Sequence, residues 1–468
     1  MGAESPEDET VSDGRSGAGS AQRLKEKEVE AMIETSGEPD APAIVYFIFY
    51  LLGMGTLLPW NFFITADSYW NYKFRNATLD ANSNATDTTT DLQYNFFAYL
   101  SVASMLPNTI FLTLNAVLAD KINQQLKLLV ALGVVIVFFI VTTILVPVNS
   151  DQWQSTFFAI TMVMVVILNV GAAVFQGGLF GLSAQFPSKY LSAVLSGQAL
   201  GAVFACVCRI VSIAVSGDDE VAAAVNSALV YFTLADITLA VSMGAYLWMT
   251  RMAFYKYYTV LHGPKRAANE LVDLGQRSSA AVKAPSVSVW RVFLKVKWFA
   301  LAVCLVFLVT LSMFPAITAK IEPMRASTKE NPSVWARDYF VPVCCFLLFN
   351  LTDYIGRICG GYTVWPKKHQ WYIVLALVVL RVVFVPLFMY CNIDHKHLTT
   401  VFDHDAYYIV IMIVFGLSNG YLATLCMIYG PGSVEPEEQN TASSMMAAFL
   451  GLGLCLGALL SNVTIKII

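Results

Sequence analysis

The stretch LFNLTDYIGRICGG, residues 348–361, places two charges inside an apolar run that is long enough to cross a lipid bilayer. Asp353 and Arg357 stand four positions apart, about one helical turn, within the run YFVPVCCFLLFNLTDYIGRICGGY of residues 339–362. A charge at the centre of a membrane costs about 2.5–3.5 kcal/mol on insertion scales, and such residues usually mark function. The stretch therefore predicts a membrane-spanning helix with a functional site on it.

The composition of the whole chain is that of an integral membrane protein. Of its 468 residues, 57% are hydrophobic and only 13% are charged, whereas a soluble domain carries about 25% charged residues. The net charge of −4 argues against a nucleic-acid partner. The nine cysteines lie in or beside apolar runs, so we expect them to pack, without forming a disulfide framework or a metal site.

Eleven stretches have about the 20 apolar residues that a membrane-spanning helix needs. Two of the connections between them, 67–93 and 251–295, are long. Glycines at four-residue spacing recur in these stretches and indicate close helix packing. The expected spans are 43–66, 94–119, 126–148, 154–182, 191–215, 224–250, 296–319, 337–361, 369–391, 404–430 and 440–466.

The basic residues of the connections predict the orientation. Residues 251–297 hold nine Lys and Arg against two acidic residues, which places this segment in the cytoplasm. The loop 67–93 is then external, where the sequons at Asn76 and Asn84 would be glycosylated, and the carboxyl terminus is external too. Residues 1–42 are polar and acid-rich, and we expect a disordered cytoplasmic tail.

The long cytoplasmic segment 251–295 divides the spans into six and five. We therefore expect an all-α membrane protein with eleven transmembrane helices in a major-facilitator-like arrangement of two bundles, residues 43–250 and 296–468. In such transporters the substrate cavity lies between the bundles near the middle of the membrane. The plasma membrane is the expected location, and an intracellular membrane is the alternative.

Four residues of the eighth expected span, Phe346, Asn350, Asp353 and Arg357, form one stripe along a helix. The order of acid before base at i,i+4 favours an ion pair. A purely structural pair is the simpler interpretation, but desolvation makes a buried pair a poor source of stability. We therefore favour a cavity wall.

The first span contains Pro59, which cannot donate to the preceding turn and so kinks the helix. Beyond it Leu57, Trp60 (or Asn61) and Ile64 share one face. Trp60 lies near mid-span rather than at a membrane interface, so it offers either a flat surface for an aromatic ligand or ordinary packing.

Amide side chains on other spans suggest further contacts. Gln176 is the middle member of a seven-residue repeat, Asn169, Gln176 and Ser183, and its amide has a donor and an acceptor side by side, as a heterocycle edge requires. A hydrogen bond between helices is an equal alternative. Prolines interrupt two more spans, beside Met105 and Asn108 in one and at Phe314 and Pro315 in the other.

Three other intramembrane charges stand apart from the stripe. Arg209 and Asp236 are placed where they could form a bridge between two spans, and the role of Arg381 stays open. Since Asp353 and Arg357 offset each other, the ligand should be neutral overall. A diol with a flat heterocycle, as in a nucleoside, fits this chemistry, and a hexose would use similar groups. No P-loop, HExxH, GxSxG or CxxC pair is present, so neither an enzyme nor a cofactor is expected.

Five motifs resemble those of the equilibrative nucleoside transporter family, in an animal-type member. They occur in the family's order, each in the matching span: GTLLPWNFF, QGGLFGL…FPSKY…SGQALGA, MFPAIT, FNLTDYIGR and SNGYLATLCMIYGP. The resemblance covers residues 43–466. It implies facilitative transport of nucleosides such as adenosine and uridine by rocker-switch alternating access.

The resemblance also implies roles for the candidate residues. Leu57, Trp60 and Leu454 would border the nucleobase, and Gln176 would bond it. Asp353 and Arg357 would hold the ribose, with Asn350 and Phe346 beside them. Ile64, Phe314 and Pro315 would form the external constriction, and Met105 and Asn108 complete the expected lining.

Two other functions remain open at this point. The same fold could couple nucleoside or nucleobase transport to protons, or the chain could be a polytopic receptor or channel, for which a division into six and five spans is awkward. The expected partners are the nucleoside and the lipid bilayer, and no protein partner is indicated.

Overall fold

The structure is a computed structural model, and it describes residues 42–75, 90–118, 122–215, 220–261, 288–323, 333–363, 365–393, 400–402 and 404–467. These residues form helices and one isolated β-bridge between Ile321 and Ile393. The acidic tail and both sequons, at Asn76 and Asn84, lie outside the described residues.

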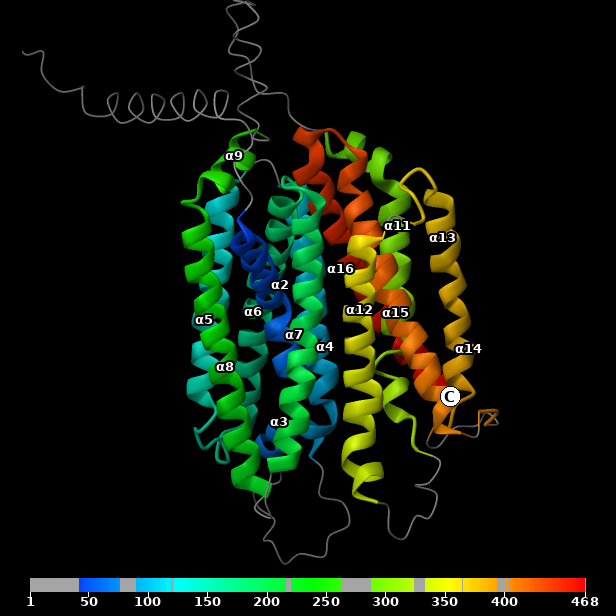
Figure 1. Ribbon diagram of the computed structural model, residues 1–468. Coiled ribbons are helices and arrows are strands. Elements are labelled where there is room, and N and C mark those ends of the chain that lie inside the picture. Colours follow the sequence, from blue (N-terminus) through cyan, green and yellow to red (C-terminus); the bar gives the residue numbers. More distant parts are fainter. Residues whose placement is uncertain are drawn as a thin grey trace, which may run out of the picture.

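The amino-terminal half of the chain forms one group of helices, coloured blue to green in Figure 1. Helix α2 packs on α7 and α8, α5 packs on α6 and α8, and α4 packs on α6. Short helices α3 and α9 extend the group at its two ends. The bounds are α2 (Ala43–Thr65), α3 (Asp67–Lys73), α4 (Asp91–Val117), α5 (Gln124–Leu145), α6 (Gln154–Ser183), α7 (Ser188–Val215), α8 (Glu220–Met249) and α9 (Ala253–Leu261).

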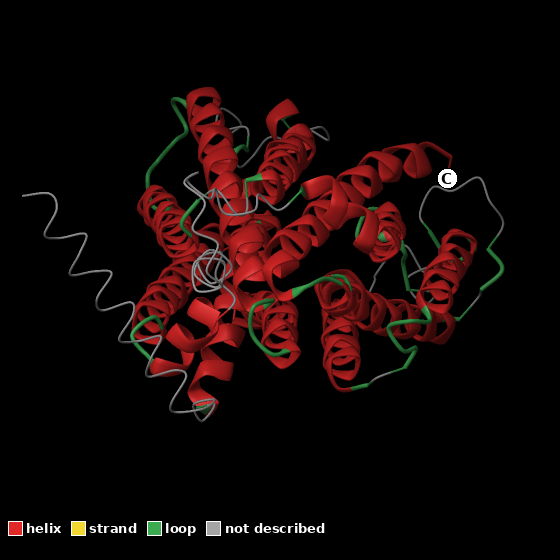
Figure 2. Cartoon of the chain, turned by 90° about the horizontal axis from the view of Figure 1, so that it is seen from above, coloured by secondary structure: helices red, strands yellow, loops and turns green. Residues whose placement is uncertain are grey.

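The carboxyl-terminal half forms a second group, in which α11 packs on α13 and α16, and α12 packs on α15. Contacts between the two groups run from α4 and α6 to α16, and from α7 to α12. Seen from above, the described chain consists of helices joined by loops, with no sheet among them (Figure 2). The bounds are α11 (Val289–Met313), α12 (Leu348–Tyr362), α13 (Trp371–Leu380), α14 (Phe384–Met389), α15 (Asp405–Tyr429) and α16 (Gln439–Ile467).

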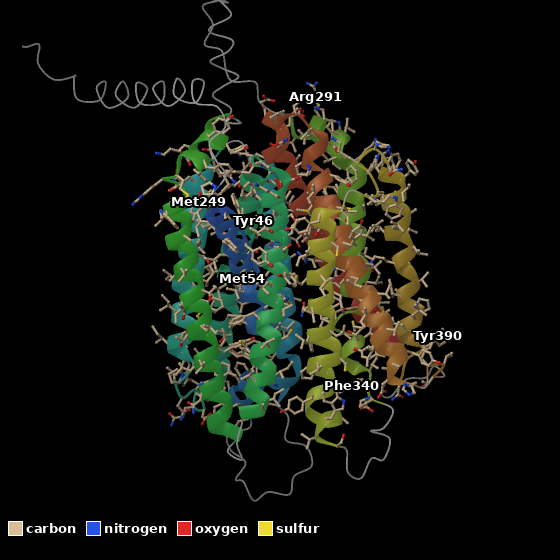
Figure 3. All side chains as sticks on the ribbon, viewed as in Figure 1. Tyr46, Met54, Met249, Arg291, Phe340 and Tyr390 are labelled. Carbon is tan, nitrogen blue, oxygen red and sulfur yellow. The ribbon has the colours of Figure 1, made fainter. Side chains whose placement is uncertain are left out.

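The two ends of the molecule are distinguished by labelled side chains in Figure 3. Met249 and Arg291 lie near the end that carries α9, and Phe340 and Tyr390 lie near the opposite one. We call these the α9 end and the Phe340 end. Described residues from both ends of the basic segment that is predicted to be cytoplasmic, those of α9 and Arg291, lie at the α9 end.

Ten helical segments of the described chain are long and apolar enough to cross a membrane. The apolar stretch of α4 is shorter, Val102–Val117, so the count of eleven stays a prediction. Apolar side chains such as Val163, Val230 and Leu459 point outward and are exposed, as a surface that faces lipid requires. The all-helical membrane fold is thus confirmed.

Two helices depart from regular α geometry where proline falls. Pro342 has no N–H for the preceding turn, and α12 is preceded by π-helical turns over Trp335–Tyr339 and Val341–Leu347. Between α13 and α14 a 3₁₀ turn over Arg381–Val383 precedes Pro386, which cannot donate to the carbonyl of Val382. The first irregular segment contains Phe346, and the second contains the buried Arg381.

Glycines set the close approach of α12 to α15. A Cβ atom on Gly420 would lie 2.0 Å from the carbonyl oxygen of Asp353, and one on Gly356 would lie 2.3 Å from that of Leu417. Only glycine allows backbones so near. The packing predicted from glycine spacing is present here, and it holds α15 directly behind the Asp353 turn.

Candidate functional site

A cavity of about 190 Å³ lies between the two helix groups. All ten predicted binding residues line it, and so do the three predicted constriction residues, Ile64, Phe314 and Pro315. The binding residues come from five helices and the turn before α12: Leu57, Trp60, Met105, Asn108, Gln176, Phe346, Asn350, Asp353, Arg357 and Leu454.

The predicted ion pair forms within α12. The Nε of Arg357 donates to Oδ2 of Asp353 at 2.8 Å, and both side chains are almost fully buried. The other carboxylate oxygen, Oδ1, accepts from Nδ2 of Asn419 at 2.6 Å. Each carboxylate oxygen therefore has one protein donor and keeps a further lone pair for a ligand.

Arg357 also contacts the amino-terminal helix group. Its Nη1 donates to the carbonyl oxygen of Leu195 in α7 at 3.0 Å and reaches Oε1 of Gln198 at 3.4 Å. The Nε2 of Gln198 in turn donates to the hydroxyl of Thr56 in α2 at 2.9 Å. One guanidinium thus connects α12 to α7 and, through an amide, to α2.

Aromatic rings border the ion pair toward the Phe340 end. The ring of Phe314 stacks on Phe349, with centroids 4.1 Å apart, and meets Phe346 edge-on at 5.7 Å. Asn350 donates to the carbonyl of Phe346 at 3.0 Å and lies 3.3 Å from the sulfur of Cys206 in α7. The predicted stripe of Phe346, Asn350, Asp353 and Arg357 therefore forms one wall of the cavity.

The amides of α6 face the cavity from the other helix group. Gln176 is only 4% exposed and makes no hydrogen bond with another described residue, so its donor and acceptor are both left for a ligand. Asn169 donates to the carbonyl of Val165 at 2.8 Å, which turns its oxygen away from its own helix. Ser183, the third member of the repeat, is buried outside the cavity and donates to Phe180.

Sequence reasoning missed four polar residues of the lining. They are Thr56 of α2, Gln198 of α7, Thr310 of α11 and Asn419 of α15. Gln198 donates to Thr56, and Thr310 donates to Asn419. Each is a single polar residue on its helix face, without a periodic partner. The only available signal was that three of them lie inside quoted motifs: Thr56 in GTLLPWNFF, Gln198 in SGQALGA and Asn419 in SNGYLATLCMIYGP.

The bridge considered between Arg209 and Asp236 is wrong within the described chain. Oδ2 of Asp236 accepts from Thr143 of α5 at 2.6 Å, and Oδ1 has no hydrogen-bond partner. Asp236 therefore faces α5, away from the cavity. Among the described residues no cluster of three His, Cys, Asp or Glu side chains is placed to hold a metal ion, and no disulfide joins the nine cysteines.

Comparison with known proteins gives close relatives. Residues 162–466 match the family profile described as nucleoside transporter. The chain is 37% identical to human equilibrative nucleoside transporter 1, over 91% of this chain and 98% of that protein. It is 36% identical to mouse equilibrative nucleoside transporter 2, over 90% of this chain and 97% of the relative.

Solved structures share the fold at low sequence identity. A proton:xylose symporter of the major facilitator superfamily superposes with a TM-score of 0.57 and 11% identity, covering 89% of this chain and 87% of the symporter. A human organic anion transporter gives a TM-score of 0.53 and 13% identity, over 91% and 94% of the two chains. These likenesses support the major-facilitator arrangement of the helices.

Proposed function

This chain belongs to the equilibrative nucleoside transporter family, and we propose that its central cavity binds a nucleoside such as adenosine or uridine. The protein is a facilitative nucleoside transporter and not an enzyme. The observation that carries the proposal is the joint placement of Asp353, Arg357 and Gln176 around one cavity. The carboxylate of Asp353 can accept from a diol, the guanidinium of Arg357 can donate to it, and the amide of Gln176 can bond the edge of a heterocycle.

The ribose is assigned to the α12 wall. The free lone pairs of Asp353 can accept from vicinal hydroxyls, and the guanidinium of Arg357 donates to the same oxygens. Asn350 and Phe346 border this part of the cavity. Because the acid and the base are already paired at 2.8 Å, a neutral ligand adds no net charge to the buried site.

The nucleobase is assigned to the opposite wall. Leu57, Trp60 and Leu454 give it apolar surface, and the amide of Gln176 can bond its edge. Met105 and Asn108 complete this side. Buried amides that lack a protein partner are costly, which favours a ligand as the missing partner of Gln176.

Transport would proceed by rocking of the bundles 43–250 and 296–468 around the cavity. Hydrogen bonds between the helix groups support a closed α9 end: Tyr50 donates to Tyr354 at 2.6 Å, and Ser443 donates to the carbonyl of Phe180 at 2.8 Å. Ile64, Phe314 and Pro315 are assigned to the constriction on the other side. We call the boundary between the two helix groups at this end the seam. Opening the α9 end requires these hydrogen bonds across the seam to break.

The protein is a multi-pass membrane protein, and we assign the α9 end to the cytoplasm. The nine basic residues of 251–297 support this orientation, which leaves the sequons of Asn76 and Asn84 outside. The plasma membrane is the assigned location. No protein partner is assigned.

Uptake of labelled adenosine and uridine into oocytes tests the proposal, with wild type beside Asp353→Ala and with surface biotinylation of both. Wild type should show saturable uptake that unlabelled uridine on the far side accelerates, since a carrier exchanges substrate and a pore does not. The variant should lose most uptake at equal surface amount. Normal uptake by Asp353→Ala would show the ribose assignment to be wrong.

Proton coupling is separated from passive transport by the pH dependence of uptake. The described cavity lining contains no histidine, and its one carboxylate, Asp353, is held by two nitrogen donors. Uptake should therefore be flat from about pH 5.5 to about pH 7.5, a range in which histidine would titrate. A sharp rise toward the acidic end would favour proton coupling.

A further inference from the structure

Arg381 is the one buried guanidinium of the described chain that contacts no carboxylate. It lies in the 3₁₀ turn between α13 and α14 and is only 2% exposed. It does not line the cavity. Burial of an unpaired ion costs several kcal/mol even after relaxation, so its presence here needs a reason other than packing.

All three nitrogens of Arg381 are used on neutral acceptors of α11 and α15. Nε donates to the hydroxyl of Ser418 at 3.1 Å, and Nη1 donates to the carbonyl oxygen of Val306 at 2.9 Å. Nη2 donates to Oγ1 of Thr310 at 3.0 Å and reaches the carbonyl of Phe415 at 3.4 Å. The guanidinium also lies over the ring of Phe415, 4.9 Å from its centroid.

These contacts decide where the single hydroxyl proton of Thr310 points. Its Oγ1 has two acceptors in reach, the carbonyl of Val306 at 2.8 Å and Oδ1 of Asn419 at 2.6 Å. Arg381 already supplies a proton to Val306 and another to Oγ1 itself. The hydroxyl of Thr310 can therefore donate to Oδ1 of Asn419. Without this bond the amide oxygen would have no donor.

The orientation of the Asn419 amide follows from that proton. Because Oδ1 accepts from Thr310, Nδ2 must face the other way, and there it donates to Oδ1 of Asp353 at 2.6 Å. A flipped amide would set its oxygen against the carboxylate, and the hydroxyl proton of Thr310 would then have only the Val306 carbonyl as acceptor, to which Arg381 already donates. Arg381 thus acts on the carboxylate through two polar groups.

We propose that Arg381 is a positioning residue for the hydroxyl-binding carboxylate of the transport site, acting through Thr310 and Asn419. The inference rests on the proposed function, since it assigns Asp353 to the sugar hydroxyls. With Asn419 in place, one oxygen of Asp353 is held by an amide and the other by Arg357, and the remaining lone pairs point into the cavity. Loss of the relay should weaken recognition of hydroxyl groups in particular.

The experiment compares the KM of uridine with that of 2′,3′-dideoxyuridine in the full-length protein. Thr310→Val replaces the hydroxyl by a methyl group at nearly constant volume, and Arg381→Met removes the charge from a long side chain. Each should raise the KM of uridine about tenfold, the effect of losing one hydrogen bond to a charged group. The KM of the dideoxynucleoside should change by less than about twofold, because it lacks the 2′- and 3′-hydroxyls that are assigned to Asp353.

Matched controls separate positioning from packing. Thr310→Ser keeps the hydroxyl and should retain the wild-type KM ratio of the two nucleosides. Ser418→Ala removes a contact of Arg381 that lies outside the relay, and it should also retain the ratio. Arg381→Lys keeps the charge but lacks the two-pronged donor geometry, so it should behave like Arg381→Met.

The possible failures are distinguishable. Absence of saturable nucleoside uptake by the wild type would overturn the proposed function itself. Wild-type uptake together with an unchanged KM ratio in Thr310→Val would overturn the role of Arg381 alone. Since Thr310→Val is the mildest change, its ratio decides the matter even where Arg381→Met fails to reach the cell surface.

Discussion

Removal of two hydroxyl groups at the α9 end should shift the carrier toward a state that is open at that end. The perturbation is the double variant Tyr354→Phe with Ser443→Ala. Tyr354 accepts from Tyr50 at 2.6 Å, and Ser443 donates to the carbonyl of Phe180 at 2.8 Å. Both bonds join one helix group to the other, so neither survives when the seam opens.

The structure limits the size of the shift. The carbonyl of Phe180 keeps two other donors, the backbone N–H of Ala184 at 3.0 Å and the hydroxyl of Ser183 at 3.1 Å, so nothing is left unsatisfied there. The Tyr50 hydroxyl is only part-buried and regains water. Each loss therefore lies at the low end of the range for a net hydrogen bond, and together they amount to about 1–2 kcal/mol. The open-to-closed ratio should rise about five- to thirtyfold.

Hydrogen–deuterium exchange of the protein in lipid nanodiscs measures this ratio. Peptides from the ends of α6 and α16 that meet at the seam should exchange faster by the same factor, because exchange follows the population of the open state. The control is Ser461→Ala, which removes a hydroxyl whose bond to Ala458 stays within α16. Unchanged exchange in the double variant, or equal acceleration in the control, would refute the reasoning.

Three further outcomes are expected, two at the site and one in the loop 67–93, which we assign to the outside. The amide of Asp353→Asn cannot accept from both Arg357 and Asn419, and breaking such a buried pair costs about 3–5 kcal/mol. The melting temperature in detergent should therefore fall clearly, and an unchanged melting temperature would contradict the pairing. Gln176→Leu loses no protein hydrogen bond, so stability should hold while the KM for uridine rises about tenfold; a stability loss with unchanged KM would make Gln176 structural. Replacing Asn76 and Asn84 by Gln should abolish the mobility shift that glycosidase produces in gels, and a persisting shift would place the carbohydrate elsewhere.

The fold was predictable to the extent that long apolar runs leave few alternatives. The expected span 43–66 corresponds to α2 at Ala43–Thr65, and 404–430 corresponds to α15 at Asp405–Tyr429. Short helix α3 was missed inside the loop 67–93, because its seven residues are too few for a periodic pattern. The π-helical turns before α12 were missed too, since hydrophobicity does not report the hydrogen-bond register.

The site was predictable where its residues share one helix. Asp353 and Arg357 pair as the i,i+4 spacing indicates. Asn419 of α15 donates to the same carboxylate, and Thr310 of α11 reaches it only through Asn419, so this chain depends on how α15 packs on α12 and α11. The expected partner of Asp236 was wrong for the same reason: opposite charge predicts attraction, but only packing decides which helix face meets which.

The contact between Arg357 and the Leu195 carbonyl has a kinetic consequence. In the proposed site the guanidinium that donates to Leu195 of α7 also donates to the ribose, so a bound nucleoside would draw its donors toward the sugar and weaken the contact between α12 and α7. Loaded carriers should then reorient faster than empty ones, so exchange of one nucleoside for another outpaces net flux. A stronger contact between Arg357 and Leu195 would slow the reorientation of the empty carrier. A weaker contact would let the empty and the loaded carrier reorient at similar rates.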